Sequence, residues 1–364
     1  MTYHRSQNLQ FSVHIHRFIF RYFFVALFWH DRYNFIVIVL PVQGDLSRVR
    51  ILLTIDIFPP NVRIYYSKNH PAVHYTKRLW PTQWRNSMYI RCWGSRGSIP
   101  VSGKSYIKYG GDTTCMEVRA ESGDVIVIDA GSGMRLLGNK LLTEAPSTIS
   151  LLFTHAHWDH LLGFGFFKPV FRRGTRINIY GCPFSLSSYQ FILQGLMSAP
   201  YFPVDLKNVK AAIKYNSITT KKFHIGSIEI MPIYLNHPNG GLGYKFTENG
   251  NSFVFLTDNE LAYQHPLGLE FKDYLKFCEG ADLLIHDAEF TPNDYPKSWG
   301  HSQFTDTVKL GVKANVGTLG LFHLNQDRTD ALVDDMVANS ITLIKKAKST
   351  MKCKAIGYGF EMKL

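Results

Sequence analysis

The chain has 364 residues and a mass of 41.7 kDa, enough for one large domain or two ordinary ones. Hydrophobic residues make up 45% of it and charged residues 19%, and this composition excludes a disordered chain. Lys and Arg number 40 against 28 Asp and Glu, a net charge of +12, which favours an anionic partner only if the charge lies on the folded part.

The first quarter of the chain differs from the rest. Residues 1–87 hold eleven basic and three acidic residues, a net +8, whereas the other 277 residues hold a net +4. Its two apolar runs, 18–29 and 35–42, are each too short to span the ~30 Å of a bilayer core, so no membrane partner is expected. Arg21 inside the first run argues against a signal peptide. We expect residues 1–87 to be a basic, aromatic extension that is poorly ordered, forms a hairpin or precedes a native start at Met88.

From Met88 onward, strand-like and helix-like patterns alternate, and residues 88–364 are expected to form one domain. Strands are predicted at 89–93, 114–118, 125–129, 149–154, 176–180, 228–235, 243–246, 253–257, 283–286 and 319–323. Helices are predicted at about 133–142, 184–197, 271–278, 304–312 and 329–346. Several strands are apolar throughout, as if covered on both faces, which indicates a layered α/β architecture.

The cysteines indicate a reducing compartment and not a framework of disulfide bonds. There are five, an odd number, and they are widely spread with no Cys-x-x-Cys pair: Cys92, Cys115, Cys182, Cys278 and Cys353. This pattern argues against disulfides and against a Cys-type zinc finger. We therefore expect a reducing, cytoplasmic location, with Cys115 in the core.

The densest chemical signal follows the predicted strand at 149–154. Four candidate metal ligands fall within six residues, namely His155, His157, Asp159 and His160. A loop at a strand end can turn successive side chains toward one point, and imidazole with carboxylate suits zinc first, or manganese or iron. Three further candidates follow other strands: His237, Asp258 and His323. The seven together are enough for two divalent ions that share a carboxylate.

These residues resemble the dinuclear metal signature of the metallo-β-lactamase superfamily, and VIVIDAGSG at 125–133 is similar to its first motif. The resemblance covers about residues 88–364 and implies a four-layer αββα sandwich with both metals at one edge. It implies that one metal is held by three histidines and the other by Asp159 and two histidines, with Asp258 bridging; the histidines are His155, His157 and His237 for the first, and His160 and His323 for the second. Asp159 is thereby also a catalytic group.

Two motifs narrow the branch of the superfamily. LIHDAEF at 284–290 and GHS at 300–302 are similar to motifs of the phosphodiesterase branch, which includes tRNA 3′-processing endonucleases. The resemblance implies that His301, oriented by Asp287, protonates the leaving group, while His286 is structural. Asp258 and the missing export signal disfavour the β-lactamases proper, and His157 disfavours the flavo-diiron branch, which has a carboxylate there.

Spacing separates a nuclease from a small phosphodiesterase. His237 and Asp258 are only 21 positions apart, which leaves no room for the tRNA-gripping arm of the endonucleases. The longer interval before His237 contains Tyr201 and Phe202, which could stack on a base. In the loop at 93–104, Arg96 or Lys104 could contact a phosphate.

We therefore expect a cytoplasmic dinuclear hydrolase that cleaves a small phosphodiester, with cyclic nucleotides or other small cyclic phosphates as the leading substrates. A hydroxide held by the metals would be the nucleophile. The alternatives are an RNA or DNA nuclease, a lactone or thioester hydrolase, and a non-catalytic binding protein of the same fold. Nucleic acid is a less favoured partner, and a homodimer remains open.

Overall fold

A computed structural model describes residues 87–181, 188–218 and 221–364, together with the backbone of five strands between residues 24 and 75. The chain divides into two compact units, Met1–Arg85 and Asn86–Leu364. Each unit is described by itself.

The first unit contains one antiparallel sheet in which each strand pairs with the next along the chain. The strands are β1 (Phe24–His30), β2 (Tyr33–Leu40), β3 (Arg50–Asp56), β4 (Val62–Ser67) and β5 (His70–Tyr75). The described parts of the two apolar runs thus lie in the paired strands β1 and β2, while the rest of those runs lies outside the described residues.

The second unit contains two seven-stranded sheets. The first has the order β11-β10-β9-β8-β7-β6-β19, and the second has the order β12-β13-β14-β15-β16-β17-β18. The bounds in the first sheet are β6 Tyr89–Gly94, β7 Cys115–Arg119, β8 Val125–Ile128, β9 Thr148–Leu152, β10 Arg176–Gly181, β11 Ala212–Ser217 and β19 Glu361–Lys363. The bounds in the second are β12 Phe223–Ile225, β13 Ile228–Tyr234, β14 Leu242–Glu248, β15 Asn251–Leu256, β16 Leu283–Asp287, β17 Thr318–Phe322 and β18 Lys352–Ala355.

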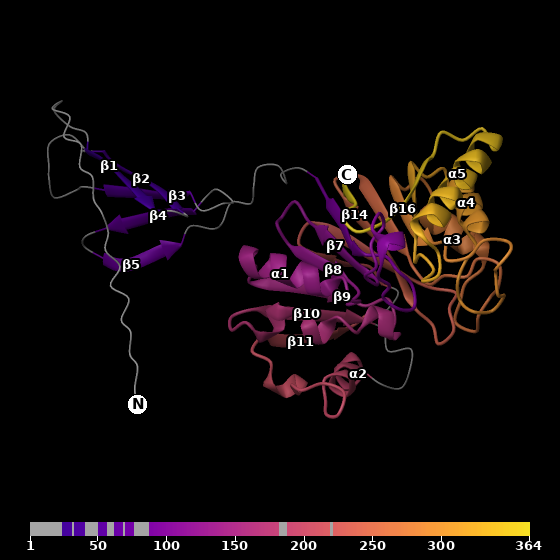
Figure 1. The fold of residues 1–364 in the computed structure, drawn as a ribbon, viewed down its shortest axis with the longest axis horizontal. Helices are drawn as coiled ribbons and strands as arrows, with labels where there is room; N and C mark the ends of the chain where they lie inside the picture. The colour runs from indigo at the N-terminus through magenta and orange to yellow at the C-terminus, as the bar shows by residue number, and fades with distance from the viewer. Residues whose placement is uncertain are drawn as a thin grey trace. The chain divides into compact units, whose positions relative to one another are not determined.

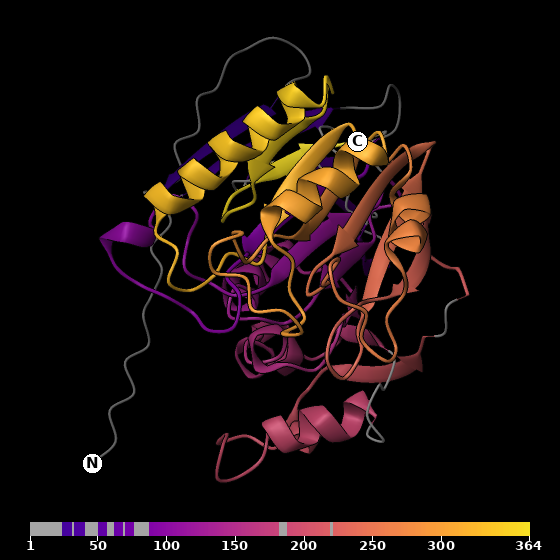
Figure 2. The same cartoon turned by 90° about the vertical axis from the view of Figure 1, so that its right-hand side faces the viewer.

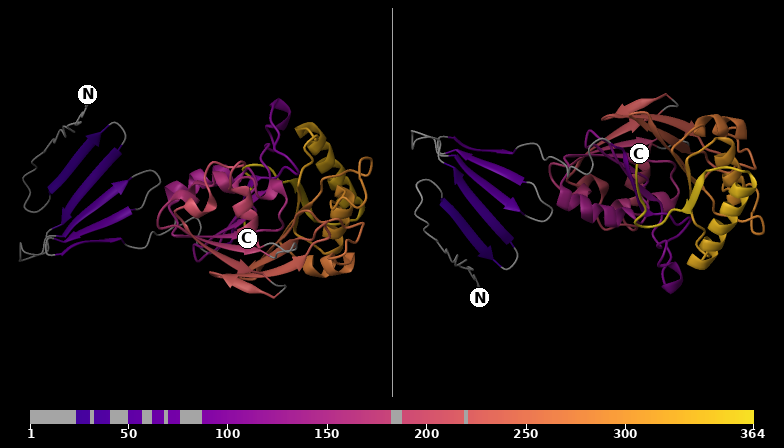
Figure 3. Two further views of the ribbon diagram at one scale, coloured as in Figure 1. Left: turned by 90° about the horizontal axis from the view of Figure 1, so that it is seen from below. Right: turned by 90° about the horizontal axis from the view of Figure 1, so that it is seen from above.

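Helices cover the outer faces of both sheets (Figures 1 and 2). On the first sheet, α1 (Met134–Glu144) packs near β6, and α2 (Tyr189–Leu196) follows β10. On the second sheet lie α3 (Phe271–Cys278), α4 (Phe304–Lys313) and α5 (Asp330–Lys346), which contact one another in that order. Figure 3 shows the two sheets between these helices. The expected four-layer αββα sandwich is confirmed.

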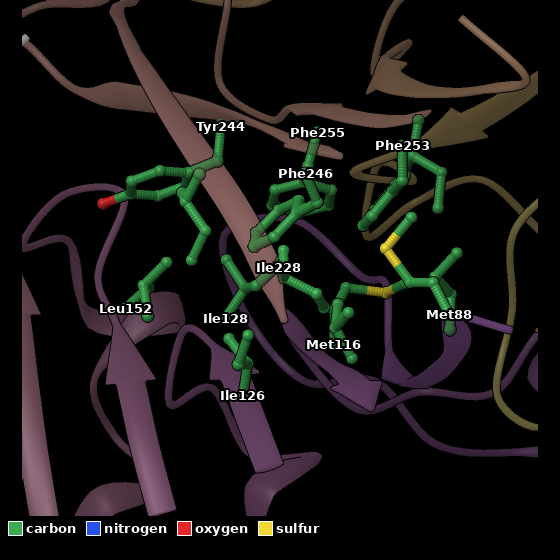
Figure 4. Close-up of a cluster of buried hydrophobic side chains, with 14 of the residues drawn as sticks. Met88, Met116, Ile126, Ile128, Leu152, Ile228, Tyr244, Phe246, Phe253 and Phe255 are labelled. Atoms are coloured by element: carbon green, nitrogen blue, oxygen red, sulfur yellow. The ribbon is translucent and has the colours of Figure 1, made fainter. Parts of the chain in front are cut away.

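The alternation of side chains along each strand explains why apolar runs form the inner layers. In β15, Phe253 and Phe255 face the other sheet, whereas Val254 and Leu256 pack against the helices. Figure 4 shows Phe253 and Phe255 with Ile126 and other side chains of the first sheet in one cluster. Each fully buried side chain of this size contributes about 1.5–3 kcal/mol, so a strand that is apolar on both faces is stable only between two covering layers.

Every strand and helix predicted from residue 89 onward corresponds to an observed element, with ends shifted by a few residues. The largest difference is at α2, which begins at Tyr189 because the Ser188 hydroxyl caps it by accepting from the Phe191 amide; residues 182–187 of the predicted helix lie outside the described residues. Strands β11, β12, β18 and β19 were not predicted. Cys115 is buried, as expected.

The topology brings several strand ends to one edge. Strands β8 to β11 are parallel in the first sheet, and β15 to β18 are parallel in the second. Strand β13 runs in the same direction as β15 because both are antiparallel to β14. Residues that directly follow these strands therefore meet at the carboxyl edge of the sandwich.

Candidate metal centre

The seven predicted ligands lie in four loops at this edge. His155 to His160 follow β9 and end in a 3-10 turn at Trp158–His160. His237 follows β13, Asp258 follows β15 and His323 follows β17. Asp258 and His323 have φ values of 51° and 56°, a left-handed conformation that is uncommon among residues other than glycine and is concentrated at functional sites.

Four of the side chains form a first group: His155, His157, His237 and Asp258. Each offers one ligand atom, and these atoms all lie within 4.8 Å of one another. The Nε2 atom of His237 is 3.2 Å from Nδ1 of His157 and 4.0 Å from Oδ2 of Asp258. The Nε2 atom of His155 is 3.5 Å from the same oxygen. Three imidazoles and a carboxylate thus converge on one point.

A second group contains Asp159, His160 and His323 and shares Asp258 with the first. The Nε2 atom of His160 is 3.2 Å from Oδ2 of Asp159 and 3.3 Å from Oδ1 of Asp258. The Nε2 atom of His323 is 3.1 Å from Oδ2 of Asp159 and 3.4 Å from Oδ2 of Asp258. Asp258 therefore presents its two oxygens between the groups, which is the arrangement of a bridging ligand.

The imidazoles are held for metal binding by the atoms on their far sides. In four of them Nδ1 contacts a protein oxygen: Thr154 Oγ1 at 3.1 Å for His155, Asp129 Oδ2 at 2.8 Å for His160, the Gly300 carbonyl at 3.0 Å for His237 and Glu289 Oε2 at 2.9 Å for His323. An acceptor at Nδ1 places the proton there and leaves the Nε2 lone pair facing the group.

Two of these inward nitrogens have no hydrogen-bond partner. The Nε2 atoms of His155 and His160 are buried and, among the described residues, make no hydrogen bond, although carboxylate oxygens lie 3.2–3.5 Å away. An unpaired buried polar atom is costly, so each such atom in a folded protein needs an explanation. Divalent ions that accept nitrogen and oxygen ligands satisfy both atoms, and the donor set fits zinc best.

The electrostatics of the centre also favour a cation. Burial raises the pKa of Asp258, but the His323 and His160 rings outweigh this and hold it well below its usual range. Burial lowers the pKa of His155 well below its ordinary value and that of His237 to about 3. Asp258 is therefore ionised and His155 and His237 are neutral at pH 7, which are the forms that bind metal ions. Burial lowers the pKa of His160 and of His323, but the neighbouring carboxylates outweigh it and raise both pKa values well above the ordinary value, so each of these rings would release a proton when a metal ion binds.

His301 lies beside this centre, as predicted. Its Nδ1 atom is 2.7 Å from Oδ2 of Asp287 and 3.3 Å from Oε2 of Glu289. Its ring stacks on that of His323, with centroids 4.6 Å apart. Burial lowers the pKa of His301, but the Glu289 and Asp287 carboxylates outweigh it and raise the pKa to about 9. In this environment the His301 ring is in its cationic form, with the proton on Nδ1 facing Asp287.

Three residues with clear roles at the site had weak signals in the sequence. Asp129 and Glu289 stood inside recognisable motifs, yet only the structure shows that they orient His160 and His323. The Asp-x-Gly pattern after β8 was the one available signal for Asp129. Glu260, a buried carboxylate two residues after Asp258, had no signal at all.

Other residues singled out in the sequence lie elsewhere. The expected Arg96 contact with phosphate is wrong, because its side chain is fully buried and donates to the carbonyls of Gly110, Asn325 and Arg328. His286 is buried and contacts Asn259, which agrees with a structural role. Tyr201 is exposed, whereas Phe202 packs edge-on against Phe166.

Two glycines allow the backbone to lie directly against the ligand rings. A Cβ atom on Gly97 would lie 2.4 Å from the His323 ring, and one on Gly300 would lie 2.2 Å from Nδ1 of His237. Gly300 also has a φ of 93°, which side chains disfavour.

We expect Gly97→Ala to displace His323 and to lower the zinc content of the purified protein, measured by mass spectrometry of the metal. Gly195→Ala is the matched control, because Gly195 lies in α2 with nothing within 4 Å of its added methyl group. A full zinc complement in the Gly97 variant would show that the contact is not needed.

Comparisons with known proteins agree with this geometry. A family model for the beta-lactamase superfamily domain matches residues 125–324. The chain is 22% identical over 283 residues to Ribonuclease Z of Picrophilus torridus, an alignment that covers 65% of this chain and 85% of that protein.

Solved structures show the same fold. Yeast PDE1, solved unliganded, aligns with a TM-score of 0.56 at 13% identity, covering 76% of this chain and 99% of that one. A diphosphatase from the PhnP family aligns with a TM-score of 0.55 at 16% identity, covering 76% of this chain and 98% of that one. Among the described residues, no helix combines the length and apolarity that crossing a bilayer requires. The chain belongs to the beta-lactamase superfamily and is a metal-dependent hydrolase with the metallo-β-lactamase fold.

Proposed function

We propose that residues 88–364 form a dinuclear phosphodiesterase that cleaves small phosphodiesters, with cyclic nucleotides and other small cyclic phosphates as the leading substrates. The observation that carries the proposal is the pair of four-ligand groups that share Asp258, with the His301–Asp287 pair beside them. Two adjoining cation sites suit the displacement of an oxygen from phosphorus.

The proposed ligands of the first ion are His155, His157, His237 and Asp258, and those of the second are Asp159, His160, His323 and Asp258. Divalent ions, zinc first, would neutralise a phosphoryl oxygen and activate a water molecule. Asp159 accepts from the Ser98 backbone amide at 2.9 Å, which fixes its carboxylate in the second group. Asp129 and Glu289 orient His160 and His323 from behind.

His301 is proposed to protonate the departing oxygen of the substrate. Asp287 holds Nδ1, so Nε2 remains free to transfer a proton. Glu289 adds a second negative charge near the ring and favours its protonated form. An alkoxide leaves far less readily than an alcohol, so this proton matters most for substrates with a basic leaving group.

The surroundings of the centre support a substrate that carries a ring. Trp158 lies within the ligand loop and is 75% exposed. Aromatic faces open to solvent near a phosphate-binding centre stack on bases. The interval between His237 and Asp258 contains little more than β14 and β15, so a long RNA-gripping arm is absent from that stretch, and a small substrate is favoured.

The test is hydrolysis of bis(4-nitrophenyl) phosphate by the zinc- or manganese-loaded protein, followed by a screen of 3′,5′- and 2′,3′-cyclic nucleotides. Metal-dependent release of nitrophenol is the expected result. Turnover of a lactone or a thioester without any of a phosphodiester would overturn the proposal.

A nuclease is the second candidate, because the curated relative Ribonuclease Z is named for that activity. If it is correct, labelled RNA is cut and affinity for RNA falls steeply with salt. Affinity should then fall in a chain that begins at Met88, because the basic residues 1–87 are gone. Met88 is buried and its backbone pairs with Leu364, so such a chain keeps the core of the second unit.

Metal removal offers a test that is independent of activity. Zinc at about 100 times its dissociation constant stabilises the folded state by about 2.7 kcal/mol, which raises the Tm of a unit of this size by roughly 5 °C. We expect a chelator to lower the Tm measured by differential scanning fluorimetry and zinc to restore it. Calcium should have no effect, because it prefers six to eight oxygen ligands and this centre is rich in imidazole. An unchanged Tm with zinc would contradict the assignment of a metal centre.

A further inference from the structure

Glu260 is a buried carboxylate near the metal centre that accepts as many hydrogen bonds as Asp287, namely four. It is 0% exposed and lies two residues after Asp258. It accepts hydrogen bonds from four donors: the backbone amide of Ser298 at 2.7 Å, the Tyr295 hydroxyl, the backbone amide of Gly300 at 2.7 Å and Nε2 of His265 at 2.8 Å. Yet it belongs to none of the metal-binding groups found among the described residues.

The donors show what this carboxylate holds. Two are backbone amides of the segment 298–300, and bonds to an ionised acceptor are about twice as strong as neutral ones. The segment needs such support, because Ser298 has a φ of 72°, a left-handed conformation that a residue with a side chain rarely adopts. A strained backbone persists only where its surroundings fix it. Glu260 is therefore the anchor of this segment.

The anchored segment reaches the centre at two points. The carbonyl of Gly300 accepts from Nδ1 of His237 at 3.0 Å and so sets the orientation of that ring. The next residue is His301, whose ring lies edge-on to His237 with centroids 5.2 Å apart. A shift of the segment would move a proposed ligand and the proposed acid together.

Glu260 is also tied to the loops that carry two ligands. Its own amide donates to the carbonyl of Asn236 at 2.9 Å. The Asn236 amide in turn donates to the side chain of Asn259 at 2.8 Å. Asn236 directly precedes His237, and Asn259 directly follows Asp258. The ends of β13 and β15 are thus locked together beside the centre.

We propose that Glu260 is a positioning residue: its carboxylate fixes the segment 298–301 so that His237 keeps Nε2 toward Asp258 and His301 keeps its place beside His323. Its catalytic readout rests on the proposed phosphodiesterase function, whereas its effect on metal affinity does not. Glu260 touches neither substrate nor metal in this proposal and acts through its neighbours.

The test uses Glu260→Gln, which keeps the size of the side chain but replaces one acceptor oxygen with a donor. The substrates are methyl 4-nitrophenyl phosphate, which has a good leaving group, and methyl phenyl phosphate, which has a poor one. We expect kcat on the phenyl ester to fall about 10- to 100-fold, the usual effect of losing an outer-shell partner, and kcat on the nitrophenyl ester to fall much less. In a His301→Ala background the same substitution should add little to the loss on the phenyl ester.

Zinc affinity gives the readout that is independent of the substrate. We expect it to weaken about 10- to 100-fold in Glu260→Gln. The matched control is Glu279→Gln, since Glu279 is exposed at the end of α3, before the start of β16, whereas the centre lies at the carboxyl ends of the strands. Should Glu260→Gln fail to fold, Tyr295→Phe removes one of the four donors and should move both readouts the same way by less.

Two results would overturn the proposal: zinc affinity and leaving-group preference both equal to wild type, or losses from Glu260→Gln and His301→Ala that simply multiply. If the wild-type protein cleaves neither ester, the phosphodiesterase function fails, and the zinc affinities alone decide the role of Glu260.

Discussion

Replacing Asp258 by Ala is expected to remove both metal ions and to lower kcat/KM by about 10³-fold or more. Asp258 is the one carboxylate that both ligand groups share, and it is fully buried. Its loss leaves the first group with histidines alone and the second with Asp159 as its only carboxylate, so the negative charge that compensates two cations is halved. Metal content by mass spectrometry and steady-state hydrolysis of bis(4-nitrophenyl) phosphate measure the two effects.

The matched control is Asp335→Asn, because Asp335 is exposed on α5. It should keep the metal content and activity of the wild type. An Asp258→Ala protein that still binds one ion tightly would show that the two groups are independent and that the carboxylate does not bridge. Ligand binding unaffected by the same substitution would instead favour a non-catalytic binding protein.

Replacing His301 by Ala is expected to lower kcat by about 10²- to 10⁴-fold on a phosphodiester with an alkoxide leaving group, the usual contribution of general acid catalysis. With 4-nitrophenyl leaving groups the loss should be small, because nitrophenolate departs without a proton. His301 belongs to neither of the two proposed ligand groups. We therefore expect the zinc content of the variant to stay close to that of the wild type.

His224→Ala is the control for His301, since His224 is an exposed histidine on β12. Equal losses of His301→Ala on both kinds of leaving group would contradict the role of acid and would point to substrate binding instead. Loss of zinc in that variant would make His301 a ligand, which its place in a third group of candidate ligands, with Asp258, Asp287 and His323, also allows.

The inner layers of the fold could be predicted from the sequence, because both faces of those strands are buried. A strand with the sequence VIVI, such as β8, buries every side chain only if both of its faces are covered. The edge strands had no such signal. Strand β18 reads Lys-Cys-Lys-Ala and is half exposed, and β12 has only three residues, so their pairing depends on neighbours that are distant in sequence.

The candidate site likewise has residues that could be predicted from the sequence and residues that could not. The ligands followed strand ends in a dense pattern, and the structure brings all seven of them together with His301. The roles of their partners could not be predicted, because Glu260 and Glu289 act through tertiary contacts with residues far along the chain, although Glu289 lies within the motif at 284–290. The prediction for Arg96 was wrong because a cation in a glycine-rich loop suggests a phosphate contact. In the structure its guanidinium donates instead to carbonyl groups of the loop at 325–328.

The ligand sets have a mechanical consequence. In each group two ligands follow β9 of the first sheet and two follow strands of the second. A bound ion in either group is thus a cross-link between the two sheets, at the edge where the sandwich would have to open. The rate of unfolding would then be limited by the rate of metal release. We therefore expect the protein to resist proteolysis for as long as the ions remain bound.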